Sequence, residues 1–246
     1  MNWIYISPHL DDAALSLGGL IWEQSQSGEK VAIWTICAGD PPTGNLSPFA
    51  ESLHERWGTG REVVKERRRE DVLSCERLGA HHRHFEVPDC IYRLSPKTGR
   101  YLYDSEEALW GRVHPDEKRL VDAVSEKIRE SLPPFACVVC PLTLGNHVDH
   151  DLTRTATEMA FRALNLESDD RLYYYADYPY VVTADTRLQD QKDIYLYEIS
   201  AEGIVAWQDA IACHRSQIST FWTGLDEMRS AIQSYYDQMG GIRLWK

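Results

Sequence analysis

Hydrophobic and polar positions divide the chain into alternating strand and helix patterns. Residues 3–6 are aromatic and β-branched, which predicts a short strand. Apolar residues then recur at helical spacing from Ala13 to Ser27, and Gly28 ends the pattern. The next segment, Lys30 to Ala38, is an almost continuous apolar run, as expected of a strand buried on both faces of a parallel sheet. This order predicts a right-handed strand–helix–strand crossover.

The same alternation continues towards the C-terminus. Helical periodicity predicts further helices at residues 62–78, 116–132, 151–164, 201–222 and 225–239. Further strands are expected at residues 81–85, 135–142 and 193–199. Residues 39–60 show no sustained period, so we expect a long loop there, and such loops are often functional lids. The whole pattern predicts an α/β fold with a parallel sheet.

Length, composition and charge narrow the class of protein. A chain of 246 residues with 43% hydrophobic and 26% charged residues is expected to form one soluble domain, residues 1–246. The formal net charge of −12 argues against nucleic acid and anionic membranes as partners. No run approaches the roughly 20 apolar residues of a membrane span, and no basic leader precedes residue 12, so we expect a cytoplasmic protein.

The first candidate site follows the first predicted strand. Residues 8–12, Pro-His-Leu-Asp-Asp, lie between this strand and the next helix, where open α/β sheets bind their ligands. His9 and Asp12 are one turn apart and can face a common metal ion, while Asp11 is left for proton transfer. A structural alternative is that Asp11 or Asp12 caps the helix and His9 is an ordinary loop residue.

A second motif repeats this arrangement. The strand at residues 135–142 leads to Gly145-Asn146-His147-Val148-Asp149-His150, and a helix follows. Because the carboxyl ends of parallel strands share one edge of a sheet, His9 and His147 can converge although 138 positions separate them. Two unrelated cap-and-loop coincidences are a poorer explanation than one metal site divided between the motifs.

Other patterns have structural explanations. The six cysteines are spread through apolar segments, so we expect them to be reduced and mostly buried. Cys137 and Cys140 share a Cys-x-x-Cys spacing, but on a strand such residues point to opposite faces. Gly18-Gly19 predicts close helix packing. Residues 67–71 are most simply a solvated, salt-bridged helix face, and a buried Arg67 is the sharper alternative. The histidines at 81–84 are expected to be exposed, and the aromatic run 173–182 to pack mainly in the core.

Taken in order, the two motifs resemble those of the PIG-L/LmbE-like deacetylase family, which carries Pro-His-x-Asp-Asp and His-x-Asp-His. Weaker features agree: Arg67-x-x-Glu70, then Pro88-Asp89, then His214-x-Ser216-Gln217. Leu10 stands where many family members carry proline. The resemblance implies a Rossmann-like three-layer sandwich with a mostly parallel central sheet, and a zinc-dependent N-deacetylase of sugars. It leaves Fe(II) open as the metal and a homo-oligomer open as the assembly.

The resemblance also assigns roles to individual residues. It implies the metal ligands His9, Asp12 and His150. It implies Asp11 as the general base and His147 as the residue facing the developing oxyanion, with Asp149 keeping His147 oriented and charged. Sugar contacts are implied for Arg67 and Asp89, with His214 near the pocket. A three-ligand zinc lowers the pKa of a bound water to about 7, which suits hydrolysis of an amide.

We therefore expect a metal-dependent hydrolase that removes an acetyl or other acyl group from an N-acylated amino sugar or glycoside. An amidase of thiol-sugar conjugates is a close variant. Two histidines and one carboxylate also describe non-haem iron oxygenases, which need no spare aspartate. A non-catalytic sugar- or metal-binding protein is the third hypothesis, since fold does not fix function.

Overall fold

The fold is organised around one sheet, seen in a computed structural model that describes residues 2–58, 62–164, 171–182 and 194–246. The described residues form seven strands in the spatial order β3-β2-β1-β4-β5-β7-β6. The strands are β1 Asn2–Ser7, β2 Lys30–Thr35, β3 His81–His84, β4 Cys137–Pro141, β5 Leu172–Tyr175, β6 Tyr195–Tyr197 and β7 Ile242–Trp245. Strands β1 to β5 pair in parallel, and β7 pairs antiparallel with β5 and β6. This confirms the mostly parallel sheet.

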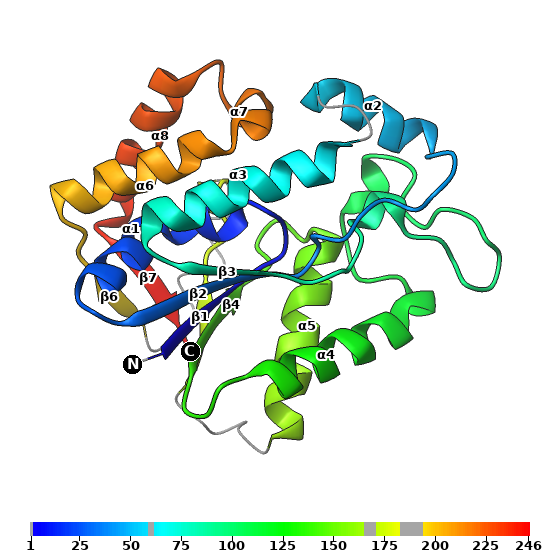
Figure 1. The fold of residues 1–246 in the computed structure, drawn as a ribbon, viewed down its shortest axis with the longest axis horizontal. Coiled ribbons are helices and arrows are strands. Elements are labelled where there is room, and N and C mark those ends of the chain that lie inside the picture. The colour runs from blue at the N-terminus through cyan, green and yellow to red at the C-terminus, as the bar shows by residue number, and fades with distance from the viewer. Residues whose placement is uncertain (1, 59–61, 165–170, 183–193) are drawn as a thin grey trace.

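Helices cover both faces of the sheet and complete three layers (Figure 1). The helices are α1 Asp12–Gln26, α2 Pro48–Trp57, α3 Val63–Leu78, α4 Lys118–Ser131, α5 Val148–Ala163, α6 Ala201–Cys213, α7 Arg215–Phe221 and α8 Leu225–Met239. α1, α3, α6 and α8 share a core with one face of the sheet, and α4 and α5 share a core with the other. The Rossmann-like three-layer prediction is confirmed.

Strand β1 shows why the sheet is central. Trp3 and Tyr5 point into the core beneath α1 and α6, whereas Ile4 and Ile6 point into the core beneath α4 and α5. All four side chains are at most 8% exposed. Burying each large apolar side chain stabilises the fold by about 1.5–3 kcal/mol, so a strand with two apolar faces is most stable in the middle of the sheet.

Gly18 and Gly19 allow α6 to approach α1 closely. A Cβ atom added to Gly18 would lie 2.4 Å from Cδ1 of Trp207, and one added to Gly19 would lie 2.9 Å from Cγ2 of Ile199. The indole N–H of Trp207 donates to the carbonyl oxygen of Ala14 at 2.8 Å. The close-packing prediction for the two glycines is confirmed.

Two predicted elements differ from the observed ones. The loop expected at 39–60 contains helix α2, which the hydroxyl of Ser47 caps by accepting the N–H of Ala50 at 3.1 Å. Pro48 occupies its first turn, and Gly58 ends it at φ 70°, so local capping signals outweigh a weak hydrophobic period. The helix expected at 201–222 is broken at His214, whose ψ of 60° separates α6 from α7.

The sheet is also longer than predicted at its antiparallel end. Strand β7 was not expected, since residues 242–245 follow a helix directly and show only one apolar alternation. Strand β6 covers Tyr195–Tyr197 within the strand expected at 193–199, and residue 193 lies outside the described residues. All six cysteines are free, and all but Cys213 are buried, as predicted.

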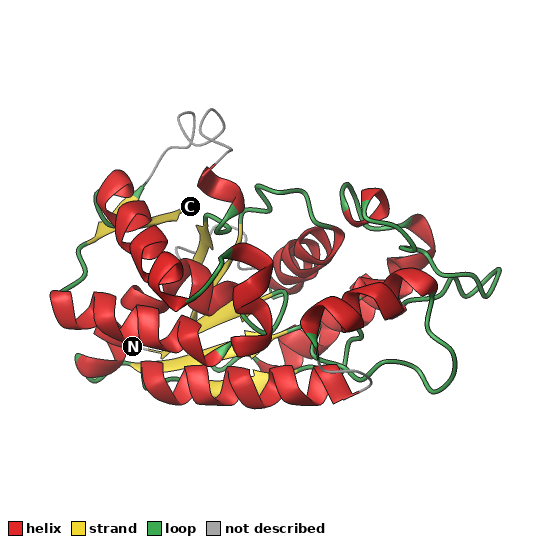
Figure 2. Ribbon diagram, turned by 90° about the horizontal axis from the view of Figure 1, so that it is seen from above, coloured by secondary structure: helices red, strands yellow, loops and turns green. Residues whose placement is uncertain are grey.

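The order of the strands fixes where a ligand can bind. From β1 the chain builds β2 and β3 on one side, then returns to place β4 and β5 on the other side. Open α/β sheets bind ligands at the carboxyl ends of strands beside such a reversal, here β1 and β4. Figure 2 shows loops and helix ends gathered at one end of the molecule, beyond the strands. No helix in the described part of the chain is long and apolar enough to cross a membrane.

Candidate active site

The loop after β1 brings His9 and Asp12 into contact. Oδ2 of Asp12 accepts the backbone N–H of His9 at 2.8 Å and lies 3.1 Å from Nδ1 of the same residue. Asp11 occupies the N-cap position of α1, but its side chain accepts no capping hydrogen bond. The hydroxyl of Ser7 accepts the N–H of Ala13 at 3.0 Å instead. The structural alternative, in which the first motif is only a helix cap, is therefore wrong for Asp11.

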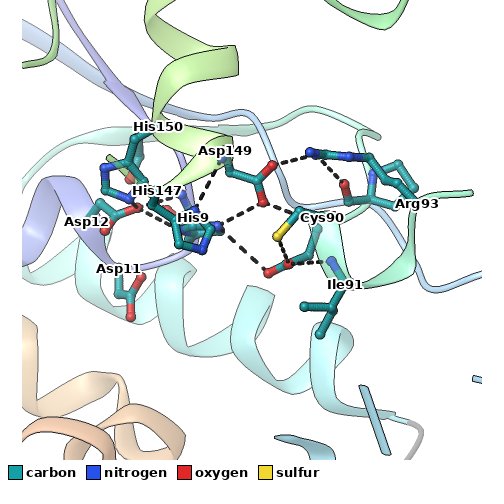
Figure 3. Close-up of polar contacts among 12 residues, drawn as sticks. His9, Asp11, Asp12, Cys90, Ile91, Arg93, His147, Asp149 and His150 are labelled. Carbon is teal, nitrogen blue, oxygen red and sulfur yellow. Dashed lines mark hydrogen bonds and ion pairs between the residues drawn. The ribbon is translucent and has the colours of Figure 1, made fainter. Parts of the chain in front are cut away.

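The second motif arrives from β4 at the same edge. His147 is the N-cap residue of α5, and its Nδ1 accepts the backbone N–H of Asp149 at 3.2 Å. His150, one turn into α5, places Nε2 3.4 Å from Oδ2 of Asp12. The ring centroids of His9 and His147 are 4.9 Å apart, and those of His9 and His150 are 5.4 Å apart. Segments 138 positions apart in the sequence thus form one cluster (Figure 3).

The atoms of this cluster have the spacing of a metal site. Tetrahedral ligands about 2.0–2.2 Å from zinc lie about 3.3–3.5 Å from one another. Oδ2 of Asp12 is 3.1 Å from Nδ1 of His9 and 3.4 Å from Nε2 of His150. Nε2 of His150 is buried and makes no hydrogen bond in the described structure. Nitrogen atoms of His9, His147 and His150 also lie within 4.8 Å of one another. These donors fit one divalent cation.

Two further aspartates orient the histidine rings. Nε2 of His9 lies 3.1 Å from Oδ2 of Asp149, and Nδ1 of His150 lies 2.5 Å from Oδ1 of Asp177. A metal ion bound here would require, in each ring, a proton on the nitrogen that faces the outer aspartate and a lone pair on the nitrogen that faces Asp12. Asp177 is not among the site residues predicted from the sequence. Its signal was its position directly after the aromatic strand β5, at the same edge of the sheet.

Asp149 is fully buried and held by a buried network. Its Oδ1 lies 2.5 Å from Nη1 of Arg93, and its Oδ2 accepts the backbone N–H of Cys90 at 2.9 Å. Arg93 forms a second ion pair with Glu117 at 2.5 Å. Burial alone would raise the pKa of Asp149, but Arg93 and His9 hold the pKa well below its usual value. The carboxylate therefore contacts His9, and only the backbone of Asp149 contacts His147.

His147 is neutral in this environment. Burial and the neighbouring His9 lower the pKa of His147 to about 3. Because Nδ1 accepts a backbone N–H, the proton of the neutral ring resides on Nε2. The role implied for Asp149, to keep this ring oriented and charged, stays a prediction, and the hydrogen bond between the two residues uses the backbone of Asp149. A neutral imidazole with a free N–H can still donate a hydrogen bond.

Asp11 is the carboxylate outside the metal-ligand cluster. It is 5% exposed, and burial raises its pKa, an effect that Arg67 partly offsets. Nη2 of Arg67 lies 3.4 Å from Oδ1 of Asp11. A carboxylate with a raised pKa that lies beside the candidate metal ligands, but is not one of them, is suited to accept and return a proton.

The interpretation of residues 67–71 as a solvated helix face is wrong for Arg67. The residue is 8% exposed and its guanidinium lies 5.3 Å from the ring centroid of Trp57, so it belongs to no solvated helix face. Asp71, its expected partner, is buried and instead pairs with His84 at 2.7 Å. His84 is therefore not simply an exposed strand histidine. The charged run 67–71 has a weak hydrophobic pattern, so the sequence does not indicate that Arg67 and Asp71 are buried.

A cleft of about 170 Å³ opens over the cluster. Six of the predicted site residues line it: His9, Asp11, Asp12, Arg67, Asp89 and His147. The other three, Asp149, His150 and His214, are at most 2% exposed. Apolar side chains form much of its wall, among them Leu53, Trp57, Leu109, Trp110 and Phe221. The segment expected to be a loop thus contributes Leu53 and Trp57 from α2.

Two of the three weaker motifs, those containing Glu70 and Ser216, contact each other at the edge of this cleft. Oε1 of Glu70 accepts the backbone N–H of Ser216 at 2.8 Å, and Oε2 accepts its hydroxyl at 2.6 Å. This contact ties α3, which carries Arg67, to the start of α7. Gln217 then lines the cleft, and His214 is buried close enough to Asp11 to lower its pKa slightly against the effect of burial.

Comparisons with known proteins agree with the geometry. A curated relative, 2′-N-acetylparomamine deacetylase of Streptomyces fradiae, is 28% identical over 186 residues, which are 74% of this chain and 58% of the relative. The chain thus spans little more than half the length of that relative.

Two solved structures are similar over almost the whole chain. The zinc-inhibited form of teicoplanin deacetylase Orf2 has a TM-score of 0.86 at 28% identity and covers 100% of this chain and 97% of its own. The A40926 pseudoaglycone deacetylase Dbv21 has a TM-score of 0.74 at 27% identity, and the match covers 99% of this chain and 95% of the Dbv21 chain.

A family model described as GlcNAc-PI de-N-acetylase matches residues 4–161, which include both motifs. Since this match covers more than half of the sequence and contains the whole histidine–aspartate cluster except Asp177, the chain belongs to the PIG-L family.

Proposed function

We propose that this protein is a metal-dependent hydrolase that removes an acetyl group from the amide nitrogen of an N-acetylated amino sugar or glycoside. One observation carries the proposal. Asp11 lies in the cleft with a raised pKa, while His9, Asp12 and His150 provide a separate set of metal donors. The family and the deacetylases that the chain resembles support the same reaction.

His9, Asp12 and His150 would hold the metal ion, which we propose to be zinc, with Fe(II) as the alternative. When bound, such an ion supplies Lewis acidity that polarises an amide carbonyl and makes water acidic near neutral pH. Asp149 and Asp177 keep the two rings in the required tautomers. Imidazole and carboxylate donors of this kind are typical of catalytic zinc sites, which keep one coordination position for water.

Asp11 is proposed as the general base and acid. It accepts the proton of the attacking water and returns it to the leaving amine, so that the acetate and the free amino sugar separate. Its raised pKa brings the carboxylate closer to the working pH, where proton transfer in both directions is most efficient. Arg67, at 3.4 Å, keeps part of the carboxylate population ionised.

His147 is proposed to stabilise the oxyanion as a neutral donor. Its Nε2–H faces the cleft, because Nδ1 is occupied by the N–H of Asp149. A donor that is already fixed by the helix N-terminus needs no reorganisation when charge develops, and losing one such donor costs about 10²–10³ in turnover. Arg67 and Asp89, which also line the cleft, are proposed to bind sugar hydroxyls.

The test is a panel of N-acetyl sugars and glycosides in which released amine is measured with and without a chelator. Metal-dependent release is expected, and Asp11→Asn should retain metal by elemental analysis while losing about 10²–10⁴ in turnover. An Asp11→Asn protein that retains its activity would favour iron-oxygenase chemistry. Stoichiometric metal without amide turnover over the panel would favour a non-catalytic binding protein.

A further inference from the structure

A second hollow lies beside the catalytic cleft. It encloses about 550 Å³, compared with about 170 Å³ for the cleft itself. Sites for small molecules typically enclose about 300–1,000 Å³. The cleft alone is smaller than this range, whereas the second hollow lies within it.

Trp110 is the residue shared by the two hollows. The residue is 43% exposed. The ring lies edge-on to His147, with centroids 5.5 Å apart, and to Tyr180, with centroids 5.8 Å apart. The backbone of Trp110 also pairs with that of His147. The indole is thus a fixed, exposed ridge directly beside the catalytic residues.

The lining of the second hollow is polar but electrically balanced. Asp151 and Glu158, on one face of α5, are paired with Arg112 and Arg154 at 2.8 Å each. Two carboxylates and two guanidinium groups leave no net charge to attract a phosphate or a cation. Such a surface suits a neutral molecule rich in hydroxyl groups, which can hydrogen-bond to both kinds of side chain.

The loop that lines the hollow is held in a strained shape. Thr143 and Asn146 have φ angles of 63° and 56°, in the left-handed region that a β-branched residue such as Thr143 rarely adopts. The same loop leads into His147. Asn146 and Thr155 also line the hollow. Strained backbone of this kind is concentrated at binding sites.

We propose that the second hollow is a subsite for a further neutral sugar. On the proposed function, the substrate is then a glycoside larger than one N-acetylated monosaccharide: its acetamido sugar occupies the cleft, and the next sugar crosses Trp110 into the hollow. Aromatic side chains offer a flat apolar face to the C–H groups of a sugar ring, while Asn146 and Thr155 provide hydrogen bonds.

The test compares kcat/KM for N-acetylglucosamine with kcat/KM for N,N′-diacetylchitobiose and N-acetyllactosamine. At least one disaccharide should exceed the monosaccharide by tenfold or more. Thr155→Trp, which fills the hollow, and Asn146→Ala, which removes an amide, should lower the disaccharide-to-monosaccharide ratio. Arg129→Ala is the control, because Arg129 pairs with Glu126 on α4, away from the hollow, and should leave the ratio unchanged.

Equal rates for the monosaccharide and both disaccharides would overturn the subsite, as would a ratio that neither Thr155→Trp nor Asn146→Ala changes. If no sugar is hydrolysed, the proposed function fails, and calorimetry with the metal-loaded protein decides the subsite separately. Saturable disaccharide binding that Thr155→Trp abolishes would support the subsite, and absence of binding by the wild-type protein would refute it.

Discussion

Nδ1 of His150 lies 2.5 Å from Oδ1 of Asp177, a residue at the end of a different strand from any of the metal donors. Asp177 is 1% exposed, and its Oδ2 also accepts the backbone N–H of Leu144 at 3.2 Å. It therefore couples the position of the His150 ring to the loop that precedes His147. Outer partners of metal-bound histidines are part of the site as much as the ligands are.

Asp177→Ala should lower zinc affinity by about 10–100-fold, since the His150 ring loses the group that fixes its tautomer. Isothermal titration of the purified protein with zinc measures the effect. Asp122→Asn on the exposed side of α4 is the control and should bind zinc as the wild type does. Unchanged affinity in Asp177→Ala would show that the ring is oriented by other contacts.

Asp11→Asn should stabilise the metal-free protein at pH 7. The pKa of Asp11 is raised by burial, so the folded state binds this proton more tightly than the unfolded state does. The resulting stability is present at low pH and is lost as the pH rises through the folded pKa. Asparagine does not ionise, so the variant does not lose this stability as the pH rises.

Thermal unfolding of both proteins at pH 4 and pH 7 tests the effect, since about 1 kcal/mol corresponds to about 2–4 °C for a chain of this size. The melting temperature of Asp11→Asn should exceed that of the wild type by more at pH 7 than at pH 4. A difference that is larger at pH 4 would contradict the raised pKa.

Arg93→Met should destabilise the fold by about 3–5 kcal/mol, because Asp149 and Glu117 would remain buried without their shared cation. Urea denaturation measures the loss, and Arg93→Lys should restore part of it by returning the charge. Arg129→Met, which breaks an exposed ion pair with Glu126 on α4, serves as the control and should leave the midpoint unchanged. Equal midpoints for Arg93→Met and wild type would mean that the network is not energetically coupled.

Gly18→Ala should destabilise the protein by about 1–3 kcal/mol, because the new Cβ would lie 2.4 Å from the Trp207 ring and force α6 away from α1. Gly224→Ala is a fair comparison, since a Cβ there meets no atom within 4 Å. A urea midpoint that drops for both variants alike would point to backbone effects and not to crowding at Trp207.

The sequence predicted the fold where hydrophobic period and chain order agree. Strands β1, β2 and β4 are apolar runs, and the helices between them end at glycines or prolines, so the sheet edge that carries His9 and His147 could be located. The proposed metal donors could be expected at one edge of the sheet because both motifs directly follow such strands. Asp149 was assigned to His147, and only the three-dimensional arrangement reveals its contact with His9.

Other features depend on contacts that no local pattern shows. Arg67 is buried beside Trp57 of α2, and nothing in the charged run around Arg67 indicates that this separate helix lies against it. The break at His214 carries neither glycine nor proline; Glu70 on α3 fixes the start of α7 at Ser216 from outside. Strand β7 pairs with β5 on one side and with β6 on the other, so its backbone hydrogen bonds depend on strands that are distant in the sequence.

The Glu70–Ser216 contact joins the part of the chain that the family model covers to a later part that it does not cover. The family model ends at residue 161, so the segment it covers contains His9, Asp12 and His150, whereas α7 lies beyond it. Glu70 holds the start of α7 against α3, and Glu70 is not one of the proposed metal ligands. On the proposed function, residues on α7 such as Phe221 can therefore vary and change what the cleft admits without altering the proposed metal ligands.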